Sequence, residues 1–124
     1  MLLENKYYQI IYTQKEDLQA VYHISILADC KVYQGHFPSN PVCPGVCNIE
    51  TIKECAIFLS GKVLMINTIK QCKLTAIASP SICPEVDIFI HLLPIKNGFT
   101  VTAKITDANT TYMEYKGDML IIDD

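Results

Sequence analysis

Residues 35–50 of this 124-residue chain read GHFPSNPVCPGVCNIE. Three prolines within seven residues predict a stiff, irregular loop, and that loop carries a single histidine, His36. The apolar pattern that follows is helical, and it contains Glu50. Pro44 and Gly45 stand where that helix should begin. The segment therefore offers a base, an acid and backbone amides at a helix N-terminus.

A helix is expected from Val46 to about Ser60, because apolar residues recur there at steps of three and four. Gly61 is expected to end it. The apolar side of this helix is predicted to hold Val46, Ile49, Ile52, Ala56 and Leu59.

Strands are expected on both sides of the helix, because short runs rich in branched and aromatic residues alternate with turn signals. They cover residues 7–14, 18–26, 63–66, 70–78, 86–93, 99–107 and 110–122. Lys96-Asn97-Gly98 is a hairpin signal between two of them. One helix with an apolar side and a sheet with an apolar face should pack together. The prediction is a single α+β domain over residues 1–124.

Composition excludes some classes of protein. The net charge of −3 argues against a nucleic-acid binder. The ten basic residues are all lysines, so no guanidinium can bind a phosphate or carboxylate in a bidentate way. No apolar run is long enough to suggest a transmembrane helix, and no signal peptide is visible, so a cytoplasmic location is expected. The six cysteines are irregularly spaced without a Cys-x-x-Cys pair, so they are expected to be free, buried thiols rather than metal ligands.

Glu50 allows two interpretations from the residues alone. It could face solvent and pair with Lys53, or it could lie at the edge of the apolar stripe, where loss of hydration raises its pKa. A carboxyl that stays protonated can act as an acid, and an imidazole suits a base at neutral pH. His36 could instead be an ordinary loop histidine. Glu54 is expected to be the surface partner of a lysine.

Two further histidines, His23 and His91, fall in alternating strands. No acidic or nucleophilic companion stands near either in the sequence, so structural roles are expected for both.

Every fixed position of the pattern G-H-F-P-x-x-P-x-x-P-G-V-x-x-x-E is filled between Gly35 and Glu50. This pattern is the active-site signature of the FabZ/FabA-type 3-hydroxyacyl-[acyl-carrier-protein] dehydratases, and the chain resembles that family. The resemblance implies the hotdog fold, in which a curved antiparallel sheet wraps one central helix. The periodicity of the sequence alone does not select that topology.

The resemblance also implies roles for the matching residues. His36 corresponds to the base that removes the proton at C2 of the substrate. Glu50 corresponds to the acid that protonates the hydroxyl at C3. Gly45 supplies the amide that polarises the thioester carbonyl, and the Val42 carbonyl orients the imidazole. Glutamate rather than aspartate at the acid position is typical of the FabZ side of the family, for which no isomerase activity is expected.

The implied substrate is an acyl chain carried on the phosphopantetheine of acyl carrier protein, with no other cofactor. The resemblance places Phe37 and Val46 among the substrate-binding residues. In the family the histidine and the acid come from opposite protomers, so a homodimer with shared sites is implied, and higher oligomers are open.

Some positions depart from the family pattern. After the acid the family continues Ala-x-Ala-Gln, where this chain has Thr51-Ile52-Lys53-Glu54, and the basic residues that help dock the carrier protein are replaced. The pathway could be fatty-acid synthesis or a polyketide or aryl-polyene type. Two alternatives stay open: a hotdog acyl thioesterase in which Glu50 activates water, and a non-catalytic subunit that binds an acyl chain or completes a heterodimer.

Overall fold

The computed structural model describes residues 2–33 and 42–122 of the chain. Strands β1 and β2 come first, a short 3-10 helix and the long helix α1 follow, and four more strands complete the chain. Their bounds are β1 (Tyr8–Glu16), β2 (Gln19–Ile26), the 3-10 helix (Lys31–Tyr33), α1 (Gly45–Ser60), β3 (Leu64–Leu74), β4 (Glu85–Ile95), β5 (Gly98–Thr106) and β6 (Thr111–Ile121).

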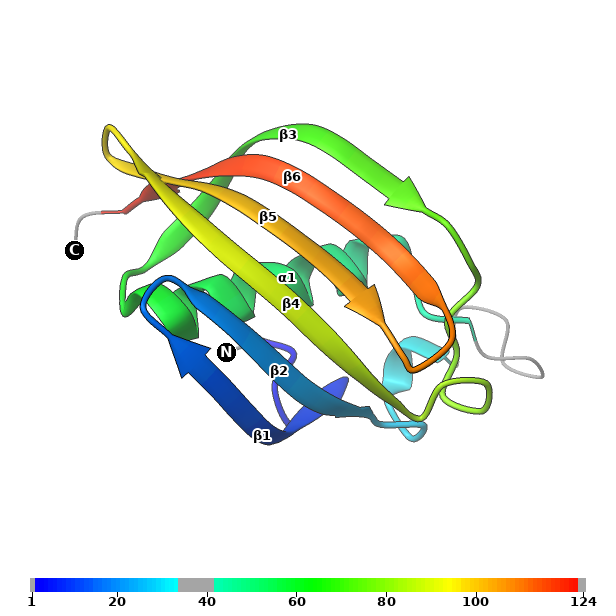
Figure 1. The fold of residues 1–124 in the computed structure, drawn as a ribbon. Coiled ribbons are helices and arrows are strands. Elements are labelled where there is room, and N and C mark those ends of the chain that lie inside the picture. The colour runs from blue at the N-terminus through cyan, green and yellow to red at the C-terminus, as the bar shows by residue number, and fades with distance from the viewer. Residues whose placement is uncertain (1, 34–41, 123–124) are drawn as a thin grey trace.

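The six strands form one sheet in the order β1-β2-β4-β5-β6-β3, and all neighbours are antiparallel. The sheet curves around α1, which runs along its concave face (Figure 1). This is the α+β hotdog arrangement that the family resemblance implies. The predicted fold is therefore confirmed.

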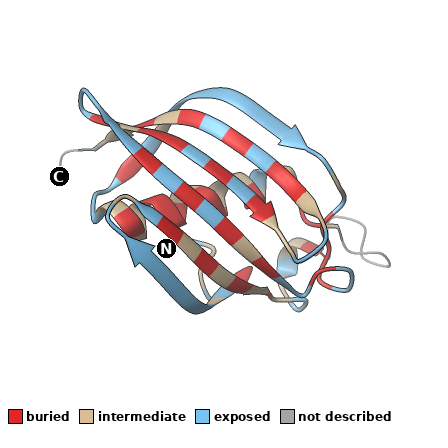
Figure 2. Ribbon diagram, in the orientation of Figure 1, coloured by how far each residue is buried: buried red, intermediate tan, exposed pale blue. Residues whose placement is uncertain are grey.

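The core lies between the concave face of the sheet and one side of α1. Buried and exposed residues alternate along the middle strands, which gives the striped pattern of Figure 2. Ile52, Ala56 and Leu59 of α1 are buried against this face, as their spacing predicts. Three of the six cysteines, Cys43, Cys55 and Cys83, are buried, whereas Cys72 is exposed on β3, which differs from the prediction.

The ends of α1 lie close to their predicted positions. The helix begins at Gly45, one residue earlier than expected, and it ends at Ser60. Gly61 follows with a φ of 70°, a left-handed conformation that favours glycine, and its N–H donates to the Ile57 carbonyl across 2.9 Å.

β3 is a single edge strand where the sequence predicts two. Two register shifts, between Ile66 and Thr68 and between Ile69 and Gln71, let the pairing with β6 continue through the polar residues in its middle. Ile69 lies opposite Gly117 and Leu74 opposite Met113, both buried, so these two β3 side chains point to the concave face. They are nevertheless exposed, Ile69 at 45% and Leu74 at 63%.

Candidate active site

The chain before α1 is anchored to the sheet. The Cys43 N–H donates to the Ala78 carbonyl across 2.8 Å, which ties the end of the motif loop to the segment after β3. Pro44 is extended, and its carbonyl accepts hydrogen bonds from the amides of Cys47 and Asn48 at 3.1 Å. No side chain of the described residues caps this helix start. The positive end of the helix dipole is therefore not offset by a capping side chain there.

Gly45 is the first residue of α1. Among the residues that the structure describes, a Cβ at this position would approach nothing closer than Cδ1 of Leu74, at 3.6 Å, which is an ordinary contact. Packing between these residues therefore does not require glycine here. A bare backbone at a helix start instead suits close approach by a ligand.

Glu50 lies in the second turn of α1 and is only partly buried, with 27% of its side chain exposed. Its Oε2 atom is 3.7 Å from Nζ of Lys53. Loss of hydration raises the pKa of Glu50, the nearby Lys53 ammonium lowers it, and the Glu54 carboxylate raises it further. The direction is upward, as expected for a carboxyl at the edge of the apolar stripe. Both interpretations of Glu50 thus hold in part, since it is desolvated and it also pairs with Lys53.

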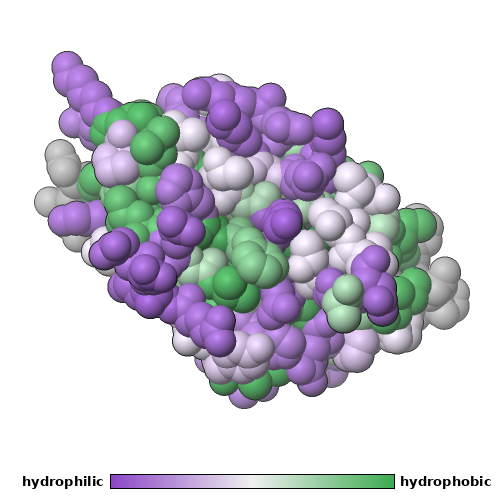
Figure 3. All heavy atoms as spheres, in the orientation of Figure 1, coloured by the Kyte–Doolittle hydropathy of each residue, from purple (hydrophilic) through white to green (hydrophobic). Residues whose placement is uncertain are grey.

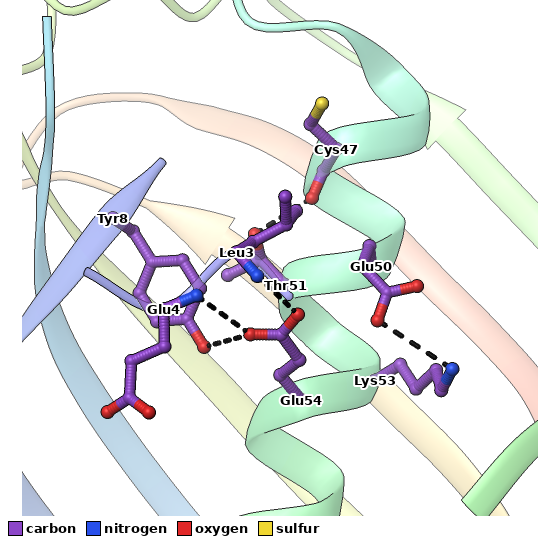
Figure 4. A network of polar contacts seen from close by, with 8 residues as sticks. All are labelled: Leu3, Glu4, Tyr8, Cys47, Glu50, Thr51, Lys53 and Glu54. Carbon is purple, nitrogen blue, oxygen red and sulfur yellow. Dashed lines mark hydrogen bonds and ion pairs between the residues drawn. The ribbon is translucent and has the colours of Figure 1, made fainter. Parts of the chain in front are cut away.

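Glu54 is not a surface residue, and the prediction that it pairs with a lysine is wrong. Only 1% of it is exposed. Its carboxylate accepts hydrogen bonds from the amides of Leu3 (3.0 Å) and Glu4 (3.1 Å) and from the Tyr8 hydroxyl (2.8 Å). These donors surround it from the N-terminal side, whereas Glu50 points toward Lys53 (Figure 4). The N-terminal segment, far away in sequence, buries Glu54.

The other predicted site residues are placed unevenly. His36 and Phe37 lie outside the described residues. Val42 is partly buried beside the start of α1. Val46 is 74% exposed, so the expectation that it belongs to the buried side of the helix is wrong. It lies in the first turn, where no other part of the described chain covers it.

His23 has acidic neighbours that the sequence did not indicate. The register between β2 and β4 places it opposite Asp87. Its Nδ1 atom is 2.7 Å from the Asp87 carboxylate and its Nε2 atom 2.7 Å from that of Glu85, while its ring stacks on Tyr12 with centroids 4.7 Å apart. Hydrogen bonds to Asp87 and Glu85 raise the pKa of His23. The expected absence of acidic companions is wrong for this residue, whereas His91 is simply exposed on β4.

A pocket of about 320 Å³ opens beside the start of α1. It is mainly apolar and is lined by Val42, Cys43, Asn48, Leu74, Thr75, Ala76, Ile77, Ala78 and Tyr112. Asn48 is buried and accepts a hydrogen bond from the Tyr7 hydroxyl at 2.7 Å. This pocket brings the described end of the motif together with the segment that follows β3.

A larger hollow of about 550 Å³ lies elsewhere, and its lining includes Phe89, His91 and Lys104. These exposed residues belong to the convex face of the sheet, which is mostly hydrophilic with a hydrophobic area near its centre (Figure 3). The Lys104 ammonium lies 5.3 Å from the centre of the Phe89 ring. Because the sheet separates this hollow from Glu50 and Gly45, we assign the candidate site to the smaller pocket.

The described residues offer neither a metal site nor a helix that could span a membrane. No three His, Cys, Asp or Glu side chains of residues 2–33 and 42–122 gather in a way that could hold a metal ion. None of the helices in that part of the chain is both long and apolar enough to cross a membrane.

Comparison with protein families and sequences gives two related matches. Residues 12–114 match the family model ApeI-like, described as ApeI dehydratase. Over 55 residues the chain is 40% identical to the 3-hydroxyacyl-[acyl-carrier-protein] dehydratase FabZ of Lactiplantibacillus plantarum and 38% identical to that of Levilactobacillus brevis. Each alignment covers 39% of this chain and 37% of the relative, so the match spans well under half of these relatives' length.

Two solved structures have a similar fold. The dehydratase heterocomplex ApeI:P from Xenorhabdus doucetiae contains a chain that superposes with a TM-score of 0.73 at 18% identity, covering 90% of this chain and 96% of that one. An uncharacterized protein from Erwinia carotovora subsp. atroseptica gives a TM-score of 0.57 at 16% identity, with coverage of 93% and 91%. At these identities the structures support the fold.

Proposed function

Because the chain belongs to the ApeI-like dehydratase family, we propose that it converts a 3-hydroxyacyl thioester on acyl carrier protein into the trans-2-enoyl thioester. The observation that carries the proposal is the Glu50 carboxyl. It is partly desolvated, its pKa is raised, and it follows at the motif spacing after an uncapped helix start. That combination suits an acid that acts beside a polarised carbonyl.

The proposed reaction moves two protons and breaks one carbon–oxygen bond. His36 removes the proton at C2, and the electron pair left behind forms the double bond between C2 and C3. The bond from C3 to the hydroxyl breaks as Glu50 gives that oxygen a proton, so that water leaves. The amide of Gly45 stabilises the negative charge that develops on the thioester oxygen. These reaction steps need no redox group, and we propose that no cofactor takes part.

The substrate is proposed to enter beside the start of α1. The pocket there is mainly apolar and includes Val42, which suits the acyl chain or the thioester end of a phosphopantetheine arm. Phe37 and Val46 of the motif are proposed to contact the same chain. The exposed position of Val46 agrees with a contact outside the protomer's own core. Acyl carrier protein is the proposed partner in the cytoplasm, met by lysines because the chain lacks arginine.

We also propose a homodimer in which each site takes residues from both protomers. The concave side of β3 supports this, because Ile69 and Leu74 are apolar, point inward and are exposed in the single chain. A second copy that pairs along β3 would cover them. No strand of the described residues pairs with the outer edge of β3, which leaves its backbone groups available for that pairing.

A second candidate is a chain that needs a different partner subunit. The solved structure of similar fold is a dehydratase heterocomplex, and the same exposed face of β3 could pair with a non-identical chain. In that case the purified chain alone would be inactive, and activity would appear when the partner is present.

The test is enoyl-thioester absorbance with purified chain and a panel of 3-hydroxyacyl carrier-protein substrates. We expect turnover, and we expect His36→Ala and Glu50→Gln each to reduce kcat by at least about a hundredfold, since each removes a general acid or base. Gly45→Ala should reduce activity while leaving the fold intact, because the added methyl group meets no close neighbour among the described residues.

Matched controls are His91→Ala and Glu114→Gln, which change exposed residues on β4 and β6 away from the motif. Both should keep full activity. Release of free thiol instead of the enoyl product would identify a thioesterase. A folded chain without turnover on any substrate, alone or with a candidate partner subunit, would contradict the proposed function.

A further inference from the structure

Glu54 is a buried carboxylate to which the dehydration as described gives no task. It is 1% exposed and lies one helical turn after Glu50 on α1. Residues four apart on a helix are neighbours on its surface. A negative charge at this position raises the pKa of Glu50.

The contacts of Glu54 suit an ionised carboxylate. Both of its oxygens accept hydrogen bonds, Oε2 from the Leu3 amide and Oε1 from the Glu4 amide and the Tyr8 hydroxyl. All three partners donate, and a carboxylate without its proton is acceptor-only. Burial raises the pKa of Tyr8 far above its ordinary value, so the hydroxyl remains a donor. The negative charge is thus held in one place by groups from a distant segment.

Among the residues that the structure describes, few charged or titratable groups lie near Glu50. Lys53 lies on the same helix at 3.7 Å and favours the ionised form of Glu50. The Cys47 thiol lies about one turn earlier. Glu4, whose amide binds Glu54, is the charged residue that the N-terminal segment brings near. Among these groups, Glu54 is the buried carboxylate that hydrogen bonds hold in place beside Glu50.

We propose that Glu54 is a positioning residue for the dehydration, whose buried negative charge keeps Glu50 in the protonated form that can release water from the substrate. The proposal rests on the proposed function. It assigns Glu54 no contact with the substrate. The N-terminal segment influences the site through Glu54, because the amides of Leu3 and Glu4 and the Tyr8 hydroxyl hold the Glu54 charge beside Glu50.

The test is a carbon-13 NMR titration of the Glu50 carboxyl in the full chain. In Glu54→Gln, removal of the neighbouring charge favours ionised Glu50, so its titration should move to lower pH. Glu54→Asp keeps a charge and should restore the titration at least in part. Lys53→Met should move it the opposite way. Tyr8→Phe removes one donor but keeps the charge, so it should lower stability and leave the Glu50 titration in place.

Activity gives a second readout. In Glu54→Gln, kcat at neutral pH should fall by about tenfold for each pH unit of that shift, with little change in KM, because only the fraction of protonated acid changes. The titration needs no substrate, so a shift without turnover would reject the dehydratase and keep the coupling, whereas turnover without a shift would reject the coupling alone.

The proposal is overturned if Glu50 titrates identically in Glu54→Gln and wild type, or if Tyr8→Phe moves it as far as Glu54→Gln does. Should Glu54→Gln fail to fold, wild-type spectra decide the question. A Glu54 carboxyl carbon with the chemical shift of a protonated acid at the pH where Glu50 ionises overturns the proposal, and one with the shift of a carboxylate supports it.

Discussion

His23 shows at the scale of one residue how the sheet fixes a charge. Two carboxylates bracket the imidazole at 2.7 Å, one from Asp87 directly across the β2/β4 pair and one from Glu85 next to it. Tyr12 of β1 stacks on the ring. The imidazolium form is therefore favoured, and it links three strands at one edge of the sheet.

This arrangement predicts stability that depends on pH. The pKa of His23 is raised in the folded state above its ordinary value of 6.5. Its contribution to the free energy of unfolding is then complete below pH 6.5 and is lost as the pH rises through the raised value. We expect His23→Gln to lose about 0.5–1 kcal/mol at pH 6, the scale of partly exposed ion pairs, and less at pH 9.5.

Urea unfolding at the two pH values measures the effect. His91→Gln, which changes an exposed histidine of β4, should show no such difference between them. Equal destabilisation by His23→Gln at pH 6 and pH 9.5 would contradict a stabilising role for the charged imidazolium and leave only the stacking on Tyr12.

At this scale the sequence predicted the partly desolvated position of Glu50, whereas it misjudged the surroundings of Glu54 and His23. The pattern that marked Glu50 is local, and so is the apolar stripe beside it. His23 and Glu54 were misjudged because their partners lie 62 and 64 residues away for the histidine and 46 to 51 for the glutamate. Nothing in short-range spacing indicates a contact at such a separation. One signal was available in the sequence, because Glu54 is a charged residue at a helix position in line with buried ones.

At the scale of elements, β3 is the strand whose behaviour matters most for the proposed dimer. Its concave side carries Ile69, Cys72 and Leu74, all exposed in the chain alone, while its convex side carries residues such as Thr68, which lies opposite Asp118. The two register shifts explain why the sequence predicted two strands here. Each inserts an extra residue, which breaks the strict alternation on which the prediction depended.

We expect Ile69→Lys to convert the dimer to a folded monomer. The isoleucine is 45% exposed in the single chain, so the monomer should tolerate lysine. In a symmetric interface the change appears twice, and burying an unpaired ammonium costs about 3 kcal/mol or more. Light scattering after size exclusion measures the mass. The control is Thr68→Lys, which changes the adjacent residue on the convex side and should leave the dimeric mass unchanged. An Ile69→Lys protein of dimeric mass would place the interface elsewhere.

At the scale of the whole molecule, the sequence predicted one long helix and seven strands, where the sheet has six, but it did not predict the order of the strands in the sheet. Strand pairing such as β2 with β4 and β6 with β3 joins segments separated by α1 or by a hairpin, and alternation within a strand carries no information about its neighbour. The family resemblance supplied that topology. It also supplied the idea of a shared site, which the described chain suits because Val46 and the concave side of β3 are exposed in the single chain.

A shared site makes a quantitative prediction for mixed subunits. If His36 of one protomer works with Glu50 of the other, a dimer of one His36→Ala chain and one Glu50→Gln chain holds one doubly altered site and one intact site. Random exchange makes half of the dimers mixed, so about a quarter of wild-type activity should return on mixing two inactive proteins. Co-expression with two affinity tags and isolation of the mixed species raises the expected value to about half.

The alternative geometry gives a different result with the same proteins. If both groups came from one chain, every site in the mixed dimer would lack either the base or the acid, and no activity would return. The control mixes the His36→Ala chain with a double variant that carries both Ile69→Lys and His36→Ala. Neither chain of this mixture has the base, so no arrangement of the subunits can restore activity. Recovery in the first mixture alone would thus establish that the acid and the base meet across the dimer, with α1 of each protomer bringing its Glu50 to the histidine of the other.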